Sequence, residues 1–575
     1  MARQPGLRGE WAVALALLAA FAAFCAHGLA RDTPTVDEFA HLPAGLYTLK
    51  AGDFALFPLN PPLVRLLSAL PPLALDPVVD TEVEVVHSGW FPWQFGTAFM
   101  ERNRAGYDRL FYWGRLPVVA LGILLGLLIW RWARALYGAA GGLLALAFYA
   151  FHPAFIAHAH LATVDVGLAL FALLALYAFW RFTRRPGPGA ALLCGVALGL
   201  AQLSKFSALL LYPVFLLLAG IELARGQRFA LVWGSGAGAG WRGVAASLAA
   251  VAAIFAVSLL VLDLGYLFQG VGRPAGAFRF ASAQMRGLFA ALPAALPVPL
   301  PTPYLVGYDA LQRINEAGEY PTYLLGRVRY GASPAYFPAT LLLKTPLPLL
   351  AAWLLAPFAR GGRREGERFV WLPALVLFAV FCLVSRVHYG IRYVLPVVAL
   401  AIVWAGRLAP HLAQARRPVR TVAALLLALY PLAALRATPD TIDYFNPLAA
   451  GRGDVFLLDS NLDWGQGLKR LAAWMERERV EKVGLAYFGH VDPALYGIAW
   501  EPPRHSREPQ LARGIGPEWT AVSANFLHGL PYATYFEGRI VPVPAGAFTW
   551  LAAYPDRRYL GGGIFVVRTG GAISY

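Results

Sequence analysis

Long apolar runs separated by short polar segments dominate the chain. The first is WAVALALLAAFAAFCAHGLA, from Trp11 to Ala30. A helix needs about 20 mostly apolar residues to cross a bilayer, so these runs predict about eleven helical spans. The predicted spans are 11–30, 115–131, 138–157, 162–181, 189–203, 206–222, 244–265, 338–358, 368–384, 391–408 and 419–436. The first run is longer than a signal-peptide core and is interpreted as a signal anchor, with cleavage after it as the alternative.

Basic clusters between these runs predict the sidedness. They include Arg131 with Arg134, Arg181–Arg185, Arg225 with Arg228, Ala359–Arg368 and the run ending at Arg420. With a cytoplasmic N-terminus, alternate threading places every cluster inside, as the positive-inside rule requires. The sequence therefore predicts a transmembrane module over 1–436 with outer loops at 31–114 and 266–337. Residues 437–575 follow it as an extracytoplasmic domain.

The tail has a different pattern from the rest. Short apolar segments, VFLLD at Val455, KVGLAYF at Lys482 and WTAVSA at Trp519, flank the helix-patterned GLKRLAAWMERERV. This alternation predicts a small α/β domain. Two amphipathic stretches in the first outer loop, 39–50 and 62–75, predict helices in the membrane interface. The predicted fold class is a mainly α, polytopic membrane protein with a small C-terminal extracytoplasmic α/β domain.

Composition supports a membrane protein. Hydrophobic residues make up 58% of the chain and charged residues 14%, whereas soluble domains are roughly 25% charged. The net charge of +16 comes from short clusters between apolar runs, which indicates contact with membrane lipids rather than nucleic acid. Cys25, Cys194 and Cys382 lie in or beside apolar runs and form no disulfide framework or CxxC metal motif.

Acidic residues follow the first span directly. Asp37 and His41 are four residues apart, so they share one face of a helix, and Glu38 lies beside them. A carboxylate partly removed from water at a membrane edge can serve as a general base. The alternative is a helix N-terminus, where acidic side chains are favoured by the helix dipole alone.

A second acid, Asp165, lies at the predicted outer end of the fourth span. A buried acid in a membrane protein is costly without a partner, which makes Asp165 a candidate site residue. His158 and His160 precede it closely. Together the three could bind a divalent metal, with interfacial hydrogen bonding as the alternative.

Basic residues at outer span ends run against the positive-inside trend. They are Lys205, Lys344, Arg386 and Arg392. A phosphate at the membrane surface would suit them, whereas the alternative is contact of single side chains with lipid headgroups. In the tail, Asp459, Asn461, Asp463, Trp464 and Gln466 crowd a predicted strand-to-helix turn. They are candidates either for helix capping or for sugar contact.

Several motifs in chain order resemble one enzyme family. They are the Asp37–Glu38 pair, GDF at Gly52, NPPL at Asn60, TVD at Thr163, LSKFSALL around Lys205, GIRYVLP at Gly390, and YFNPLAAG followed by DSNLDWGQ. The sequence resembles the polyprenyl-phosphate-sugar-dependent glycosyltransferases with the C-type membrane fold. Within them it is similar to the protein O-mannosyltransferase-like branch, glycosyltransferase family 39, which includes the lipid A aminoarabinose transferases.

The resemblance implies an inverting transfer of a sugar from a polyprenyl-phosphate donor to an acceptor hydroxyl of a lipid, glycan or protein. It places the enzyme in a bacterial-type plasma membrane, with the reaction on the outer face and Asp37 as the base. Glu38 and Asp165 would orient the acceptor or hold the first loop. Donor contacts are expected from His41, Asp165, Lys205, Lys344, Arg386, Tyr389, Arg392 and Tyr393. Acceptor or sugar contacts are expected from Asn60, Asp459, Asn461, Asp463, Trp464 and Gln466.

The same resemblance leaves divalent-metal dependence open, because part of the family works without metal. The tail lacks the sugar-binding trefoil domain of eukaryotic protein mannosyltransferases, which argues against a protein acceptor.

Other classes of membrane protein fit the pattern less well. A transporter or flippase is the main alternative, but such proteins usually carry midplane charges and paired interrupted repeats. A phosphoethanolamine-type transferase needs a metal-rich soluble domain, and the tail shows no clustering of Asp and His. A polymer ligase would use a diphosphate-linked donor instead.

Overall fold

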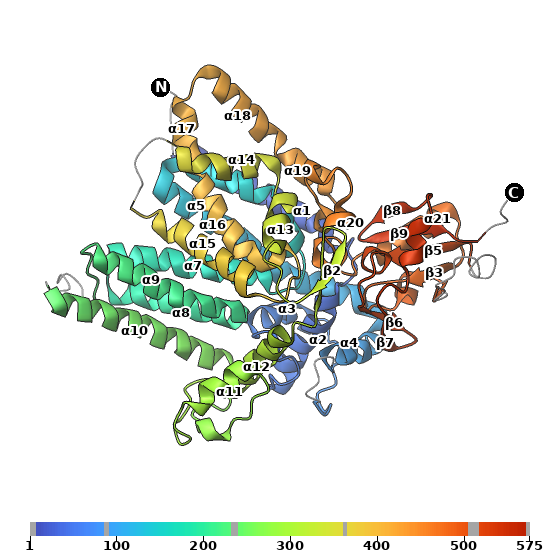
Figure 1. Cartoon of the computed structure of the whole chain (residues 1–575), viewed down its shortest axis with the longest axis horizontal. Coiled ribbons are helices and arrows are strands. Elements are labelled where there is room, and N and C mark those ends of the chain that lie inside the picture. The colour runs from blue at the N-terminus through green and yellow to red at the C-terminus, as the bar shows by residue number, and fades with distance from the viewer. Residues whose placement is uncertain (1–6, 86–90, 232–239, 360–364, 504–516, 571–575) are drawn as a thin grey trace.

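The computed structural model describes residues 7–85, 91–231, 240–359, 365–503 and 517–570. Helices form one large body, and the strands of the tail pack at its side (Figure 1). The α-helices are α1 (Leu7–Leu29), α2 (Val36–Ala51), α3 (Leu63–Leu73), α4 (Phe91–Arg102), α5 (Tyr107–Ala150), α6 (Pro153–Ala159), α7 (Asp165–Arg184), α8 (Pro188–Ser204), α9 (Leu211–Ala224), α10 (Gly240–Gly265), α11 (Ala283–Ala290), α12 (Thr302–Ala317), α13 (Tyr336–Lys344), α14 (Leu347–Leu355), α15 (Arg368–Val384), α16 (Leu395–Ala405), α17 (Leu408–Gln414), α18 (Arg417–Leu429), α19 (Pro431–Ala437), α20 (Gly453–Phe456), α21 (Leu468–Glu478) and α22 (Ala524–Leu527). This arrangement confirms the predicted mainly α membrane fold with a small C-terminal α/β domain.

The long apolar helices can be compared with the predicted spans. Seven helices in the described part of the chain are long and apolar enough to cross, or eight with a bent pair. Two predicted spans, 189–203 and 368–384, correspond to α8 and α15, which have 17 residues each. The predicted spans 115–131 and 138–157 fall largely within α5, which bends at Gly138 with φ 82° and ends at Ala150. A helix of 17 residues is still within the range of membrane-spanning lengths, so the predicted number of about eleven spans stays a prediction.

The predicted span 338–358 is not a straight helix. It divides into α13 and α14, which meet at an angle of 116°. Thr345 and Pro346 separate the two helices. A proline lacks the amide hydrogen that a continuous helix would use there, and it restricts the residue before it, so the first helix stops.

The two ends of the helical body carry different sets of charged residues. At one end Arg184 pairs with Glu365 at 2.7 Å, Arg407 with Glu367 at 2.5 Å, and Arg368 with Glu222. These groups lie where α7, α9 and α16 end and α15 begins. The opposite ends of the same helices carry Asp165 and Arg392. Part of the predicted basic run 359–368, residues 360–364, lies outside the described residues.

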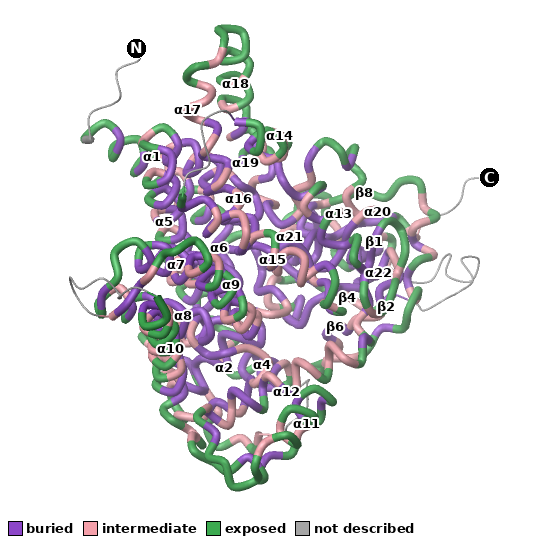
Figure 2. Tube along the Cα trace, turned by 60° about the vertical axis from the view of Figure 1, so that its left-hand side comes forward, coloured by how far each residue is buried: buried purple, intermediate pink, exposed green. Residues whose placement is uncertain are grey.

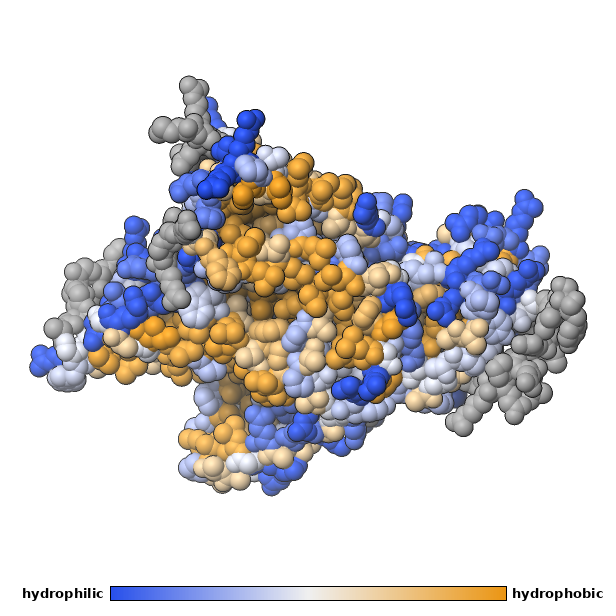
Figure 3. All heavy atoms as spheres, turned by 45° about the horizontal axis from the view of Figure 1, so that its top comes forward, coloured by the Kyte–Doolittle hydropathy of each residue, from blue (hydrophilic) through white to orange (hydrophobic). Residues whose placement is uncertain are grey.

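The outer surface agrees with a membrane setting. Exposed residues extend along α10 and α18 (Figure 2), and many of them are large and apolar, including Leu248, Leu260, Val422 and Leu425. On one face of the molecule, hydrophobic residues cover the helical body and hydrophilic residues gather over the tail (Figure 3). Lipid chains, not water, are the solvent that such a helical surface requires.

Three helices follow α1 in the first predicted outer loop. The stretches 39–50 and 62–75 are helical as predicted, in α2 and α3, and α4 is an additional helix. The first two pack closely, because a Cβ at Gly45 would lie 2.4 Å from the carbonyl oxygen of Arg65. Thr35 caps α2 through a reciprocal capping box with Glu38.

The tail contains a mixed sheet. Its strands run in the order β4 (Trp500–Glu501), β3 (Val483–Ala486), β5 (Trp519–Ser523), β9 (Ile564–Arg568) and β8 (Arg558–Gly561). β3 is parallel to both of its neighbours, and β9 is antiparallel to β5 and β8. The helix predicted after the turn is α21. The predicted strand at Val455 is wrong, because this segment forms the short helix α20.

Two small hairpins complete the strands. They are β1 (Pro321–Leu324) with β2 (Arg327–Tyr330), and β6 (Ala533–Phe536) with β7 (Arg539–Pro542).

Backbone hydrogen bonds fix the tail against the start of α2. The amides of Thr33 and Val36 donate to the carbonyl oxygens of Gln466 and Trp464 at 3.1 and 3.0 Å. Asp32 accepts from Arg470 at 2.8 Å and lies 2.8 Å from His160. Burial alone would raise the pKa of Asp32, but the charge of Arg470 and the contact with His160 hold it well below its usual range. The segment that leads to Asp37 is therefore fixed by contacts both to the tail and to His160 at the end of α6.

Candidate active site

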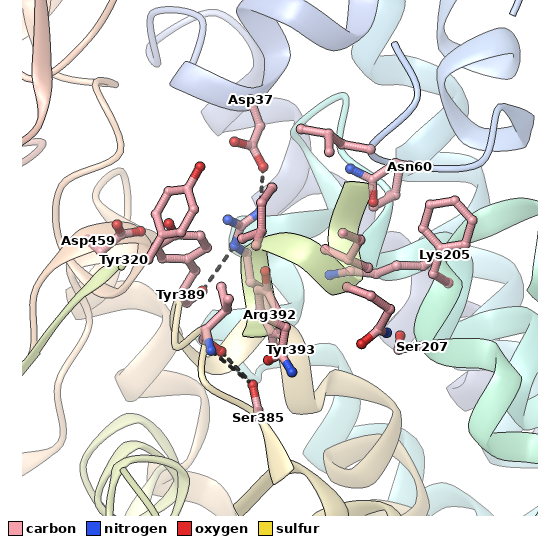
Figure 4. A pocket seen from close by; sticks show the side chains of 18 of the residues that line it. Asp37, Asn60, Lys205, Ser207, Tyr320, Ser385, Tyr389, Arg392, Tyr393 and Asp459 are labelled. Atoms are coloured by element: carbon pink, nitrogen blue, oxygen red, sulfur yellow. Dashed lines mark hydrogen bonds and ion pairs between the residues drawn. The ribbon is translucent and has the colours of Figure 1, made fainter. Parts of the chain in front are cut away.

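A cavity of about 520 Å³ lies where the first predicted outer loop, the membrane helices and the tail meet. Its volume is within the range of small-molecule sites. Nine of the predicted site residues line it: Asp37, His41, Asn60, Lys205, Tyr389, Arg392, Tyr393, Asp459 and Trp464. Several of them surround Arg392 in Figure 4. Residues from distant parts of the chain thus form one polar site.

Asp37 lies in the first turn of α2 with 22% of its side chain exposed. Its Oδ2 accepts a hydrogen bond from Nη1 of Arg392 at 2.5 Å (Figure 4). His41, one turn later on the same helix face, also lines the cavity. Burial lowers the pKa of His41 to about 4 despite the opposing attraction of Asp37. The imidazole is therefore neutral at pH 7, and Asp37 is the side chain on this face of α2 that pairs with Arg392.

Arg392 is held in place by the turn before it. It lies in a 3-10 helix, η5 (Ile391–Val394), that follows Gly390 with φ 82°. A Cβ at Gly390 would lie 2.7 Å from Oγ of Ser460, so this close approach requires glycine. The guanidinium also lies 4.2 Å from the ring centre of Trp464. Stacking and ion pairing together fix its direction.

Lys205 provides a second cation. It lies between α8 and η2 (Phe206–Leu210), and its Nζ donates to Oδ1 of Asp165 at 2.7 Å. Asp165 is fully buried, and its Oδ2 lies 3.8 Å from Nη1 of Arg392. Asp165 does not line the cavity but lies behind the two cations. It therefore orients them, and the structure gives it no direct access to a ligand.

Glu38 does not belong to the cavity. It is fully buried and accepts from Nε and Nη2 of Arg115 at 2.7 and 2.8 Å. It also accepts from the amides of Thr35 and Ala162 at 3.0 and 2.8 Å. Burial opposes ionisation, yet the charge of Arg115 holds the pKa of Glu38 below its usual range. All its hydrogen bonds serve the fold, so a catalytic role for Glu38 does not follow from this geometry.

Two of the predicted phosphate-binding cations lie elsewhere. Nζ of Lys344 is buried and donates to the carbonyl oxygens of Ile442 and Asn461 at 2.7 and 2.6 Å. It joins α13 to the tail. Arg386 is exposed, and its Nη1 donates to the carbonyl oxygen of Glu316 at 3.0 Å. Neither side chain lines the cavity, because each is committed to a backbone contact outside it.

The predicted tail contacts also divide into two groups. Asp459 and Trp464 line the cavity. Asn461 binds the Tyr336 hydroxyl and backbone groups, and Gln466 binds Asp443 and two backbone groups.

Asp463 is buried and accepts from Ser523 and from the amide of Gly465. Burial raises the pKa of Asp463 to about 8. With Asn461 and Gln466, it shapes the turn rather than reaching the cavity.

The sequence alone missed several cavity residues. Trp93 lies on α4, Tyr320 in the loop after α12, and His490 and Tyr532 in the tail. No motif distinguished these side chains, because they meet the site only through contacts between remote segments. The capping-box pattern of Thr35 and Glu38 was a local signal that pointed to a structural role for Glu38.

One side of the cavity is apolar. Leu209 and Leu210 of η2 lie there with Val380, Phe381 and Val384 of α15. The cavity therefore combines a charged region around Arg392 with a wall formed by apolar side chains at membrane helix ends. Such a site suits a ligand that has both a polar head and a hydrocarbon chain.

The predicted metal ligands do not form a cluster. His160 pairs with Asp32, and the ring of His158 packs against Trp464 with ring centres 5.8 Å apart. Among the residues described, no group of three or more His, Cys, Asp or Glu side chains is arranged to hold a metal ion.

The apolar helices and the cavity at their ends define an integral membrane protein. Residues 111–258 match the family described as dolichyl-phosphate-mannose-protein mannosyltransferase. This segment includes Asp165 and Lys205, and the match confirms the predicted resemblance there. It supports a glycosyltransferase. No curated protein sequence matches the chain.

Three solved structures are similar to the chain at low identity. ArnT from Cupriavidus metallidurans bound to undecaprenyl phosphate is 15% identical over 98% of each chain, with a TM-score of 0.45. The archaeal oligosaccharyltransferase AglB from Archaeoglobus fulgidus is 12% identical over 92% of this chain and 74% of its own, with a TM-score of 0.45. The S. cerevisiae Pmt1–Pmt2 protein O-mannosyltransferase complex is 17% identical over 46% and 34%, with a TM-score of 0.33.

Proposed function

We propose that the protein is an inverting glycosyltransferase that moves a sugar from a polyprenyl-phosphate donor to an acceptor hydroxyl on the outer face of the membrane. The observation that carries this proposal is the composition of the cavity. A carboxylate, Asp37, faces the cations Arg392 and Lys205 at its polar region, and apolar residues of η2 and α15 form the adjoining wall. A phosphate bound to a long hydrocarbon chain fits both parts.

The cations suit a phosphate leaving group. Arg392 presents a planar guanidinium that can bind two phosphate oxygens, and Lys205 adds a point charge. As the bond from the anomeric carbon to the phosphate oxygen breaks, its electron pair stays on the polyprenyl phosphate. The two cations stabilise the charge that develops there, so no protonating acid is needed.

Asp37 then serves as the general base. Its carboxylate takes the proton of the acceptor hydroxyl, and the acceptor oxygen attacks the anomeric carbon from the face opposite the phosphate. The new bond forms as the old one breaks, which inverts the configuration. Tyr389 and Tyr393 flank Arg392 and contribute to donor binding, while Asn60, Trp464 and Asp459 contact sugar or acceptor.

The proposed orientation rests on the two ends of the helices. Basic residues gather around Arg184, Arg368 and Arg407, and the cavity lies at the opposite helix ends. The positive-inside rule places the basic end in the cytoplasm and hence the cavity outside.

The direct test uses purified protein in liposomes with undecaprenyl phosphate carrying a radiolabelled sugar, and a lipid and glycan extract of a bacterial envelope as acceptor. Label should move to the extract, undecaprenyl phosphate should be released, and the new glycosidic bond should have the inverted configuration. Parallel reactions with chelator and with added Mg²⁺ or Mn²⁺ measure metal dependence.

Two results would contradict the proposal. Transfer only from diphosphate-linked oligosaccharide would indicate a ligase, and passage of intact labelled lipid across the liposome bilayer without transfer would indicate a flippase.

A further inference from the structure

His490 is a tail residue that lines the cavity together with Asp37. It follows β3 in the loop Tyr487–His490, and only 2% of its surface is exposed. Its ring packs against Phe39, two residues after Asp37, with ring centres 5.7 Å apart. The tail thus places an imidazole beside the helix turn that carries the proposed base.

The ring of His490 is only weakly bonded within the fold. Its Nδ1 is buried and makes no well-aligned hydrogen bond within the part of the chain that the structure describes, although the ring also meets a backbone group of Gly489. A buried polar group without a partner destabilises a protein. His528, in the same domain, has both ring nitrogens paired, because they contact the Tyr323 hydroxyl and the Asp454 carboxylate at 3.2 and 2.9 Å.

The loop that carries His490 is tightly fixed. A Cβ at Gly489 would lie 2.1 Å from the ring of Tyr487, so only glycine fits there. The amide of Tyr535 donates to the carbonyl oxygen of Gly489 at 3.2 Å, and Oγ1 of Thr534 donates to that of Tyr487 at 2.6 Å. The ring is therefore pre-positioned in the wall of the cavity rather than placed there by a mobile loop.

The charge state of the ring suits hydrogen bonding rather than proton transfer. Burial lowers the pKa of His490 to about 3, although Asp37 attracts its cationic form. The imidazole is therefore neutral at pH 7, with one nitrogen as donor and one as acceptor. It can bind a hydroxyl without competing with Asp37 for the proton.

We infer that His490 positions the acceptor, by a hydrogen bond between its imidazole and the acceptor hydroxyl that Asp37 deprotonates. The inference rests on the proposed function. The hydroxyl proton passes to the Asp37 carboxylate, and His490 keeps its own proton throughout. The cations lie on the membrane module, whereas His490, Phe488 and Tyr532 belong to the tail. The tail therefore contributes to acceptor binding together with Asp37 of the membrane module, and the cations of the membrane module bind the donor.

The test compares H490A, H490Q and H490F with H528Q as the matched histidine control. Apparent KM and kcat/KM are measured for the envelope extract at saturating undecaprenyl-phosphate sugar, and for the donor at saturating extract. Binding of undecaprenyl phosphate reports that each variant is folded.

H490A should lower kcat/KM for the acceptor about tenfold or more, the scale of a lost buried hydrogen bond, and leave the donor KM unchanged. H490Q should restore part of the activity, because an amide also has a donor and an acceptor, and H490F should not. H528Q should keep the acceptor kinetics of the wild type.

Equal effects on donor and acceptor, unchanged kinetics in H490A, or equal activity of H490F and H490Q would overturn this inference alone. If H490A and H490F fail to bind undecaprenyl phosphate, H490Q decides: a partly reduced kcat/KM for the acceptor with an unchanged donor KM supports the hydrogen bond, and an equal loss on the donor side overturns it. Wild-type protein that transfers no sugar would overturn both the inference and the proposed function.

Discussion

The guanidinium of Arg392 lies 2.5 Å from the carboxylate of Asp37, so the proposed base and the main proposed phosphate ligand pair with each other. Asp165 is the next acid, with Oδ2 3.8 Å from the same Nη1 atom. A donor phosphate would compete with Asp37 for this cation. Donor binding would then release the Asp37 carboxylate to accept a proton, which couples the two halves of the reaction.

Replacing Asp37 with Asn should abolish sugar transfer and preserve binding of the donor. The variant loses the base, but it also loses the anion that competes for Arg392, so undecaprenyl phosphate should bind as tightly as to wild type or up to about tenfold more tightly. Binding of labelled undecaprenyl phosphate and single-turnover transfer measure the two effects. Full turnover in D37N would reject Asp37 as the base.

Arg392 and Lys205 should differ from Arg386 in their effect on donor binding. R392A should weaken undecaprenyl phosphate binding about tenfold or more, because a charged hydrogen bond contributes roughly 1.5–3 kcal/mol. K205A should have a smaller effect, because Lys205 offers a single point charge, whereas Arg392 can bind two phosphate oxygens. R386A is the matched control, since Arg386 lies outside the cavity, and it should bind as wild type does. A larger loss in R386A than in R392A would contradict the site.

Glu38 should prove structural. E38Q leaves the buried charge of Arg115 without its carboxylate partner, which typically destabilises a protein by about 3–5 kcal/mol. Thermal unfolding in detergent should show a clear decrease in Tm, and the double variant E38Q/R115M should lose less stability than the two single changes added together. An E38Q protein with wild-type Tm and no transfer would restore Glu38 as a catalytic residue.

Asp463 should make stability depend on pH. In the folded chain the Asp463 carboxyl retains its proton up to about pH 8, whereas in an unfolded chain the same carboxyl releases its proton near pH 4. Between these values the folded state binds more protons than the unfolded state, so this contribution to stability falls as pH rises from about 4 to about 8. Unfolding temperatures of D463N, which cannot ionise there, should decrease less over this range than those of wild type. An identical decrease in both proteins would contradict the raised pKa.

Local sequence patterns predicted much of the helical body. Apolar runs fixed the positions of most helices, because each helix must cover its own backbone with apolar side chains in lipid. The number of spans stays a prediction. The bend of 116° between α13 and α14 was not predicted, because an apolar run shows length and composition but not direction.

The site was predictable in part for the same reason. Asp37 and His41 share a helix face through their spacing alone, and both line the cavity. Sequence position could not distinguish Asp37 from its neighbour Glu38. Only the packing of α5 against α2 placed Arg115 on Glu38 and left Asp37 to the cavity.

The sequence by itself therefore determined that the protein is embedded in a membrane, that its body is helical and that the segment after the first span carries the candidate base. These features depend on local periodicity and charge. The tertiary structure decided which charged residues are engaged in internal contacts away from the cavity and which of them line the cavity, where a ligand can reach them. Lys344 and Glu38 are buried against internal partners, while Arg392, Lys205 and the remote His490 line the same cavity as Asp37. That division depends on pairings between distant segments, which no local pattern encodes.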